Sequence, residues 1–373
     1  MNHHPNSNLS RDLAMPQPLF GRRRPLFCLA MLFCLAGSGM AHAFEQPKVY
    51  DLKPKDHVLI LGDSITTDGQ CTGGFVRLVD QVQHEQLPEL GAIVRAIGGY
   101  GARMPAFPGG FDYVVKMAQK PNPPTVAIIA LGVNDSGGGE KEMSVYTDKM
   151  RKAVTQLREA KMTVILCTLI GTRPHWISYS EAVRTIAVEM KCPLIDLSAA
   201  YIDNMNKNTP NKNKPDDFLP GTYPHRDGVG HLNMYGEILS ATTFLKAFGL
   251  KPVFTKYHIR CGGRMENGGF RTDELGQNYY GGGKVKVEPE MATISPPPTN
   301  PGWEANWPME QQSFTRGTKV TLTATPNAGN TFLRWERSDP NMVFPETSPK
   351  LTVTIEENMW IAAVFKPIET KKP

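Results

Sequence analysis

Residues 44 to about 250 alternate short apolar runs with amphipathic segments of helical length. Within the apolar runs, polar and apolar side chains do not alternate, which predicts strands covered on both faces. Five runs have this character: 57–61, 92–96, 126–131, 163–168 and 194–197. Buried strands that alternate with helices fold into a parallel sheet, because the helical crossovers cover its faces. We therefore expect an α/β fold with a doubly wound parallel sheet.

The segments between these runs place apolar side chains at helical spacing. Two sets each share one helical face: Tyr146, Met150, Ala153 and Leu157, and then Tyr179, Val183, Ile186 and Met190. A last helix is predicted to begin at Asn233, a favourable N-cap, and to end before Gly249. The α/β domain is thus expected to span residues 44–255.

The pattern changes after about residue 255. Paired and tripled glycines interrupt residues 256–283, which predicts a glycine-rich linker. Residues 284–367 then show strand periodicity, since Val320, Leu322 and Ala324 alternate with threonines. We expect a small C-terminal β-rich domain, and we expect it to be dispensable for chemistry because the motifs described below precede it.

Residues 1–43 have the pattern of a secretory signal peptide. Three arginines, 22–24, precede an apolar run at 25–39, and Ala41-His42-Ala43 is typical of a cleavage site. The run is short for a membrane anchor, which is the alternative. No later segment is apolar enough to span a membrane, so the sequence predicts an exported protein at a periplasmic, cell-surface or extracellular location.

Export places the cysteines in an oxidising compartment. Cys28 and Cys34 would leave with the signal peptide, and the mature chain would keep Cys71, Cys167, Cys192 and Cys261. Three complete pairings are open, and a disulfide is as much expected as none. Cys167 lies in an apolar run and is expected to be buried.

The net charge of +5 is concentrated at the start of the chain. Residues 1–43 hold four of the 41 basic and one of the 36 acidic residues, so the rest carries 37 against 35. That balance is too even for a nucleic-acid-binding protein, so no nucleic-acid partner is expected.

Candidate site residues follow the first three predicted strands. Ser64 ends the first run in Gly62-Asp63-Ser64, Gly98 follows the second, and Asn134 follows the third. His231 lies just before the last predicted helix, with Asp227 on the same loop. The carboxyl ends of parallel strands meet at one crevice, so these groups are expected to lie close together.

These four blocks, in this order, resemble the SGNH or GDSL-type esterase family over residues 55–250. The resemblance implies a flavodoxin-like three-layer fold, with Ser64 as nucleophile and His231 as base. It also implies an oxyanion hole made by the Ser64 and Gly98 backbone N–H groups and the Asn134 amide, with no cofactor and no metal. The family places its aspartate three residues before the histidine, whereas Asp227 stands four before His231. Asp227 can still orient the ring; in the alternative, a backbone carbonyl does so and the site is a Ser64–His231 dyad.

The C-terminal unit resembles a divergent internalin-type B repeat. The matching segments are Gly317–Ala324, Pro326–Gly329, Phe332–Trp335 and the final run to Phe365. The resemblance implies a β-rich spacer or adhesion module that contacts a cell surface or polysaccharide. Trp303, Trp307 and Trp360 are candidates for such a surface, with packing in the core as the alternative.

The sequence therefore predicts an exported serine esterase acting on a small-molecule or carbohydrate ester. Trp176 is a candidate to line the substrate pocket, with packing over the core as its alternative. The lack of a long hydrophobic lid region favours small acyl groups on carbohydrates. Two other functions stay open: a non-catalytic carbohydrate-binding protein on a decayed esterase scaffold, and a sugar O-acyltransferase.

Overall fold

The computed structural model describes residues 43–71, 73–98, 102–104, 110–171, 173–208, 231–266, 282–289, 292–294, 311–337, 344 and 346–368. The predicted signal peptide lies outside these residues except for Ala43, and so does Asp227. Trp303 and Trp307 also lie outside them.

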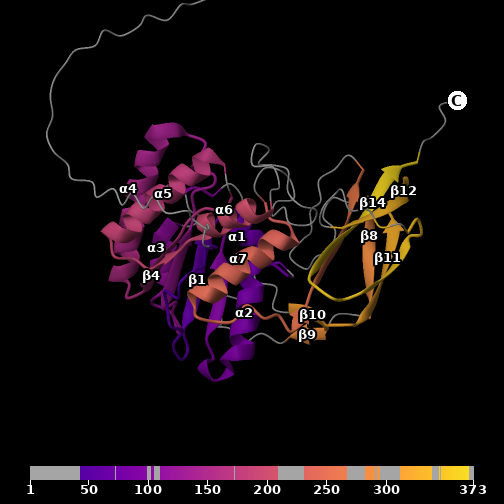
Figure 1. Ribbon diagram of the computed structural model, residues 1–373, viewed down its shortest axis with the longest axis horizontal. Helices are drawn as coiled ribbons and strands as arrows, with labels where there is room; N and C mark the ends of the chain where they lie inside the picture. The colour runs from indigo at the N-terminus through magenta and orange to yellow at the C-terminus, as the bar shows by residue number, and fades with distance from the viewer. Residues whose placement is uncertain are drawn as a thin grey trace, which may run out of the picture. The chain divides into compact units, whose positions relative to one another are not determined.

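Each of the five predicted runs forms a strand of one parallel sheet (Figure 1). The strands are β1 (His57–Gly62), β2 (Ile93–Ile97), β3 (Val126–Ala130), β4 (Thr163–Cys167) and β5 (Leu194–Ile195). Their order is β2-β1-β3-β4-β5, and every pair is parallel. This order reverses direction between β1 and β3, which is where doubly wound sheets bind ligands.

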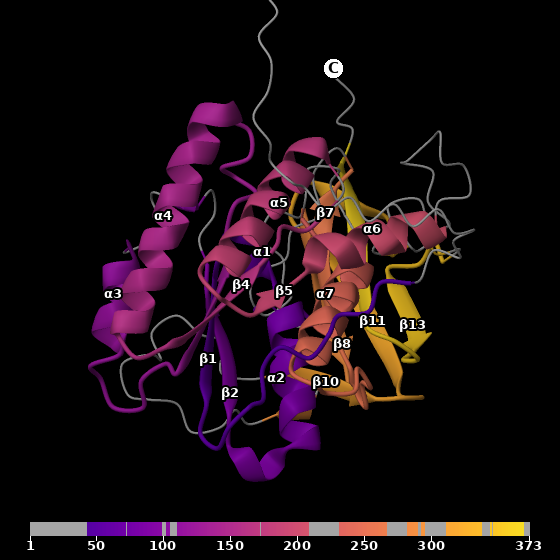
Figure 2. The ribbon, with the colours of Figure 1, turned by 60° about the vertical axis from the view of Figure 1, so that its left-hand side comes forward.

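Seven α-helices accompany this sheet in the described residues. Their bounds are α1 Ser64–Asp68, α2 Phe75–Gln86, α3 Gly110–Met117, α4 Gly139–Glu159, α5 Pro174–Glu189, α6 Leu197–Asn208 and α7 Met234–Ala247, with a short 3-10 turn at Pro88–Leu90. Side chains of α3, α4 and α5 pack on one face of the sheet, and those of α2, α6 and α7 pack on the other. Figure 2 shows α3 and α4 to one side of β1 and β2, with α2 and α7 to the other. The three-layer α/β architecture predicted from the sequence is confirmed.

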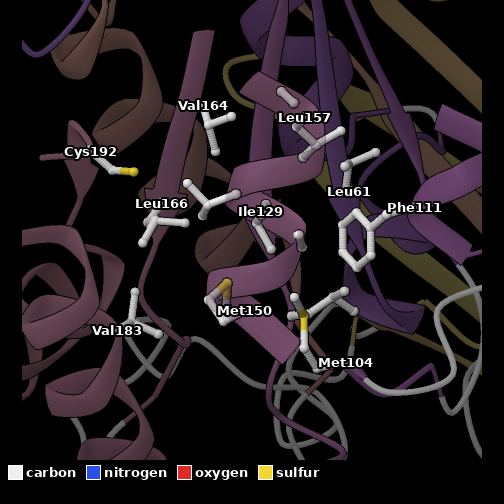
Figure 3. Packing of buried hydrophobic residues seen from close by; sticks show 14 of the residues in the cluster. Leu61, Met104, Phe111, Ile129, Met150, Leu157, Val164, Leu166, Val183 and Cys192 are labelled. Atoms are coloured by element: carbon white, nitrogen blue, oxygen red, sulfur yellow. The ribbon is translucent and has the colours of Figure 1, made fainter. Parts of the chain in front are cut away.

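Strand alternation explains how both faces become apolar. Successive side chains of a strand point to opposite faces, so Leu59 and Leu61 enter one core and Val58 and Ile60 the other. Figure 3 shows Leu61, Ile129 and Leu166 of the sheet packed with Met150 and other side chains of the first core. The sheet is thereby buried on both sides, and its carboxyl edge is where doubly wound sheets bind ligands.

The C-terminal strands form three small sheets. Their bounds are β6 Lys256–Tyr257, β7 Ile259–Met265, β8 Gly283–Glu288, β9 Ala292–Ile294, β10 Gln311–Thr315, β11 Lys319–Pro326, β12 Asn330–Arg337, β13 Lys350–Thr354 and β14 Met359–Pro367. The sheets run β13-β11-β8, β12-β14-β7 and β6-β10-β9. Val320, Leu322 and Trp335 share a buried core with Ile361 and Phe365, so the predicted β-rich region is confirmed.

The segment predicted to be a linker differs from that expectation in its first part. Residues 256–257 and 259–265 are strands β6 and β7, and β7 pairs in parallel with β14. Gly262 and Gly263, which suggested a linker, lie within β7 opposite Ala362 and Ala363. Ile259 and Cys261 are buried in the C-terminal core, and this burial outweighs the low strand propensity of glycine. Residues 267–281 lie outside the described residues.

The four cysteines of the described residues and Trp360 are all buried. Cys71, Cys167, Cys192 and Cys261 are all buried, and no disulfide joins any of them in the described part of the chain. Trp360 is fully buried, which matches core packing rather than a binding surface. Among the described residues, no helix combines the length and apolar character needed to cross a membrane.

Candidate active site

Ser64 stands at the first position of α1, directly after the central strand β1. Asp63 is the N-cap of this helix, and its Oδ1 accepts from the Ile65 backbone N–H at 3.0 Å. The helix begins abruptly because this cap satisfies a donor that the first turn would leave unpaired. Ser64 is only 8% exposed, and it lies at the carboxyl edge of the sheet, as expected.

His231 follows Ser64 by 167 residues in the sequence, and the fold places the two side chains next to each other. Its Nε2 lies 3.0 Å from Ser64 Oγ, so in the tautomer protonated at Nδ1 it accepts the serine O–H. Asn233 caps α7 by accepting from the Gly236 N–H at 3.0 Å, as the sequence predicted, and Leu232 is buried in the core. The cap and the buried leucine fix the backbone on which His231 is carried.

Gly98 follows β2 and lies against the start of α1. A Cβ at this position would come within 2.6 Å of the Asp63 carbonyl oxygen and 2.8 Å of the Thr67 backbone nitrogen. Real side chains do not make such contacts with backbone atoms, so only glycine fits. The structure therefore brings the Gly98 backbone next to the helix that begins with Ser64, as an oxyanion glycine requires.

Asn134 follows β3 and is tied to the segment that comes after Gly98. Its Nδ2 donates to the Ala102 carbonyl oxygen at 2.9 Å. The neighbouring Asp135 accepts from the Met104 N–H at 3.1 Å through both carboxylate oxygens, and burial raises the pKa of this carboxyl. The Tyr179 hydroxyl donates to the Asp135 carbonyl oxygen at 2.9 Å. These bonds link the loop after β3 to the loop after β2, which would both line an oxyanion hole.

Asp63 is the most strongly perturbed carboxyl beside the Ser64–His231 pair. It is 2% exposed, and burial raises its pKa to about 7, although the Ile65 N–H bond and the charge of His231 both act to lower it. Asp63 also lines a cavity of about 30 Å³ together with Thr66, Thr168 and Ser240. That volume holds a water molecule but no acyl chain, so the cavity is not a substrate pocket.

Trp176 does not lie where a pocket residue would. It belongs to α5, is 3% exposed, and packs in the core on the α3–α5 face of the sheet. The Arg173 guanidinium carbon lies 4.7 Å from its ring centroid. The alternative, an aromatic residue covering the core, describes its position.

Sequence reasoning did not single out Asp135 as a residue that organises the site. It stands beside Asn134 in the same block, but the bond to Met104 joins residues 31 positions apart. A local sequence pattern does not predict a hydrogen-bond partner at that separation. The only available signal was a second polar residue directly after the candidate oxyanion asparagine.

Two protein families match separate parts of this chain, and several solved structures are similar to it. Residues 60–237 match the GDSL-like lipase/acylhydrolase family, and residues 300–369 match the divergent InlB B-repeat domain. No curated protein matched the chain by sequence. Among solved structures, an acetyl xylan esterase (AlAXEase) is similar at 23% identity and a TM-score of 0.44, covering 51% of this chain and 98% of that one.

An acetylxylan esterase from Geobacillus stearothermophilus is similar at 19% identity and a TM-score of 0.44, covering 55% of this chain and all of that one. The order of motifs, the strand order and the family match agree for the α/β region. The chain thus carries a domain of the GDSL-like lipase/acylhydrolase family, followed by a divergent InlB B-repeat domain.

Proposed function

We propose that this protein is an exported serine esterase that hydrolyses carboxylic esters through an acyl-enzyme on Ser64. The observation that carries the proposal is the 3.0 Å contact between Ser64 Oγ and His231 Nε2 at the carboxyl edge of the sheet. A serine and a histidine within hydrogen-bond reach form the nucleophile–base pair that acyl transfer requires. The family match supports ester hydrolysis as the reaction.

The reaction begins when His231 accepts the Ser64 hydroxyl proton. As that proton leaves, Ser64 Oγ attacks the ester carbonyl carbon and the carbonyl oxygen becomes an oxyanion. The oxyanion accepts from the Ser64 and Gly98 backbone N–H groups and from the Asn134 amide. Each such donor is worth about 3–4 kcal/mol of transition-state stabilisation.

Collapse of this intermediate breaks the bond to the alcohol. His231 gives its proton to the leaving alkoxide, and the acyl group stays on Ser64. Water then attacks the acyl carbon while His231 accepts its proton, and the return of that proton to Ser64 releases the acid. Asp227 is proposed to accept from the protonated Nδ1 of His231 throughout.

The proposed substrates are esters of small acyl groups, with acetylated carbohydrates as the first class to test. The support is the absence of a long hydrophobic lid segment from the sequence. The predicted signal peptide supports export to a compartment in which the protein would encounter polysaccharides. The C-terminal region is proposed to contact a cell surface or polysaccharide, on the support of its B-repeat match.

Hydrolysis of p-nitrophenyl acetate, butyrate and octanoate tests the reaction class and the acyl size. We expect turnover that falls as the acyl chain lengthens and that disappears in Ser64→Ala. Absence of turnover in a folded wild-type protein would favour the non-catalytic carbohydrate-binding alternative. Acetylated sugar among the products, when a free sugar is present, would instead identify an acyltransferase.

A further inference from the structure

A fully buried arginine from the C-terminal strands reaches α1, which begins with Ser64, and α7, which follows His231. Arg260 lies on β7 and is 0% exposed. Its Nη2 donates to the Asp68 carbonyl oxygen at 3.1 Å, and its Nη1 lies 3.7 Å from Glu237 Oε1. Its guanidinium carbon lies 4.2 Å from the ring centroid of Trp360. The charge is therefore placed between an acid, a backbone carbonyl and an aromatic face.

Both polar partners stand on elements that position the site. Asp68 is the last residue of α1, the helix that begins with Ser64. Glu237 lies in the first turn of α7, six residues after His231, and its Oε2 accepts from the Phe75 N–H at 2.9 Å. One guanidinium thus joins the end of the serine helix to the start of the helix that follows the histidine.

This arrangement holds only if all of its members are present. A guanidinium stays charged in a protein, and a buried charge is stable only when paired and hydrogen-bonded. Glu237 is fully buried as well, so loss of Arg260 would leave a carboxylate in the interior. The helices would then shift to admit water or another partner, and a displacement of about 1 Å at a catalytic pair costs about 10²-fold in rate.

The position of Arg260 is set by the C-terminal strands. Arg260 is paired in register with Trp360 of β14, and its neighbours Ile259 and Cys261 are buried in the C-terminal core. Because side chains of a strand alternate, burying those two neighbours turns Arg260 to the opposite side.

A second contact anchors the residue just before this strand to the α/β domain. His258 Nε2 lies 2.7 Å from Gln81 Oε1 on α2, and the His258 backbone N–H donates to Asn358 Oδ1 at 2.7 Å. His258 and Asn358 are both buried. The segment that carries Arg260 is therefore held both by α2 and by the residue before β14.

We propose that Arg260 is a positioning residue through which the C-terminal strands hold α1, which begins with Ser64, and α7, which follows His231, in the reactive arrangement. The inference rests on the proposed function of that pair. It replaces the sequence-based expectation that residues after 255 do not affect the chemistry.

Arg264 provides a matched control. It lies on the same strand, and its Nη2 pairs with Glu336 Oε2 at 2.5 Å within the C-terminal sheets. Arg264→Met therefore removes an arginine ion pair from β7 without touching α1 or α7.

The test compares Arg260→Met, Arg260→Lys, Glu237→Gln and Arg264→Met as full-length proteins, well below their melting temperatures. We expect Arg260→Met to lower kcat about tenfold to 10²-fold with KM within about twofold, because misalignment affects the transition state. Arg260→Lys should recover only part of kcat, since one ammonium does not span both partners. Glu237→Gln keeps an acceptor for Phe75 and should lower kcat severalfold, and it serves if Arg260→Met does not fold. Arg264→Met should keep wild-type kcat.

A spectroscopic measurement separates this inference from the proposed function. The ¹⁵N shifts of the His231 ring report its contact with Ser64 whether or not an ester is hydrolysed, and we expect them to change in Arg260→Met and not in Arg264→Met. Wild-type kcat and His231 shifts in folded Arg260→Met or Glu237→Gln would overturn the proposal. So would an equal loss of kcat in Arg264→Met. A wild-type protein without Ser64-dependent turnover would defeat the proposed function alone, and the shifts would still decide the role of Arg260.

Discussion

At the residue scale, the structure brings together the two residues predicted as nucleophile and base, and their roles stay predictions. Ser64 and His231 were predicted from their places after β1 and before α7, and they lie within 3.0 Å. Both positions follow from local rules: a polar residue at the end of a buried strand, and a loop ended by an N-cap at Asn233. Asp227 lies outside the described residues, so its role stays a prediction.

Asn134→Ala tests the proposed oxyanion donor. We expect kcat to fall about 10²–10³-fold with little change in KM, because the bond forms mainly in the transition state. Steady-state kinetics on p-nitrophenyl acetate give both constants. The matched control is Ser136→Ala, which removes the 2.7 Å bond from Ser136 Oγ to the Val133 carbonyl in the same loop. If the two variants lose kcat equally, Asn134 acts on loop structure alone.

Asp63→Asn tests the buried carboxyl through the pH dependence of stability. The pKa of Asp63 is raised to about 7 in the folded protein, against 3.8 for the ordinary group. The folded state therefore holds the proton more tightly than the unfolded chain. The stability this provides is fully present below about pH 4 and is lost as pH rises to about 7.

Asparagine at position 63 stays neutral and keeps an acceptor for the Ile65 N–H. Relative to wild type, Asp63→Asn should thus gain up to about 4 kcal/mol in unfolding free energy between pH 4 and pH 8. Urea denaturation at both pH values measures the change. A difference between the two proteins that does not vary with pH would contradict the raised pKa.

At the element scale, strands were predictable where burial left a simple pattern. The five apolar runs became β1 to β5 because strands covered on both faces need apolar side chains throughout. Strand β7 was missed because Gly262 and Gly263 have low strand propensity, and its partner β14 lies about a hundred residues later. Pairing over such a distance leaves no local signal in either segment.

Gly98→Ala tests the packing of the β2 end against α1. Its Cβ would press on the Asp63 carbonyl and the Thr67 nitrogen, which cannot move without moving Ser64. We expect a lower melting temperature and a loss of kcat of about 10²-fold. Gly137→Ala is the control, because a Cβ there has nothing within 4 Å. Thermal unfolding and kcat measured together check both effects, and wild-type values for Gly98→Ala would contradict the close approach.

At the scale of the whole molecule, the sequence predicts two regions, but it does not predict the buried contacts that join them. Arg260 and His258 lie in the segment predicted to be a linker, and their partners Glu237, Asp68 and Gln81 are on three different helices. Glu237 also looked like an ordinary first-turn acid of α7. Only the fold brings these groups together in the interior.

Truncation after Gly249 tests this connection. The shortened chain loses Arg260 and His258, so the Arg260–Glu237 ion pair is broken. Breaking a buried pair by removing one partner costs about 3–5 kcal/mol, so we expect a marked loss of stability together with lower kcat. Circular dichroism melting and p-nitrophenyl acetate kinetics measure the two quantities. A truncated chain with the melting temperature and kcat of the full-length protein would show that the C-terminal strands are dispensable.

Covalent labelling identifies the nucleophile. The protein is incubated with a fluorophosphonate, digested, and mapped by peptide mass spectrometry. Because His231 activates Ser64 for attack, we expect one labelled residue, Ser64, with labelling absent in Ser64→Ala and much slower in His231→Ala. A label mapped to another serine, or labelling that persists in Ser64→Ala, would show that Ser64 is not the nucleophile.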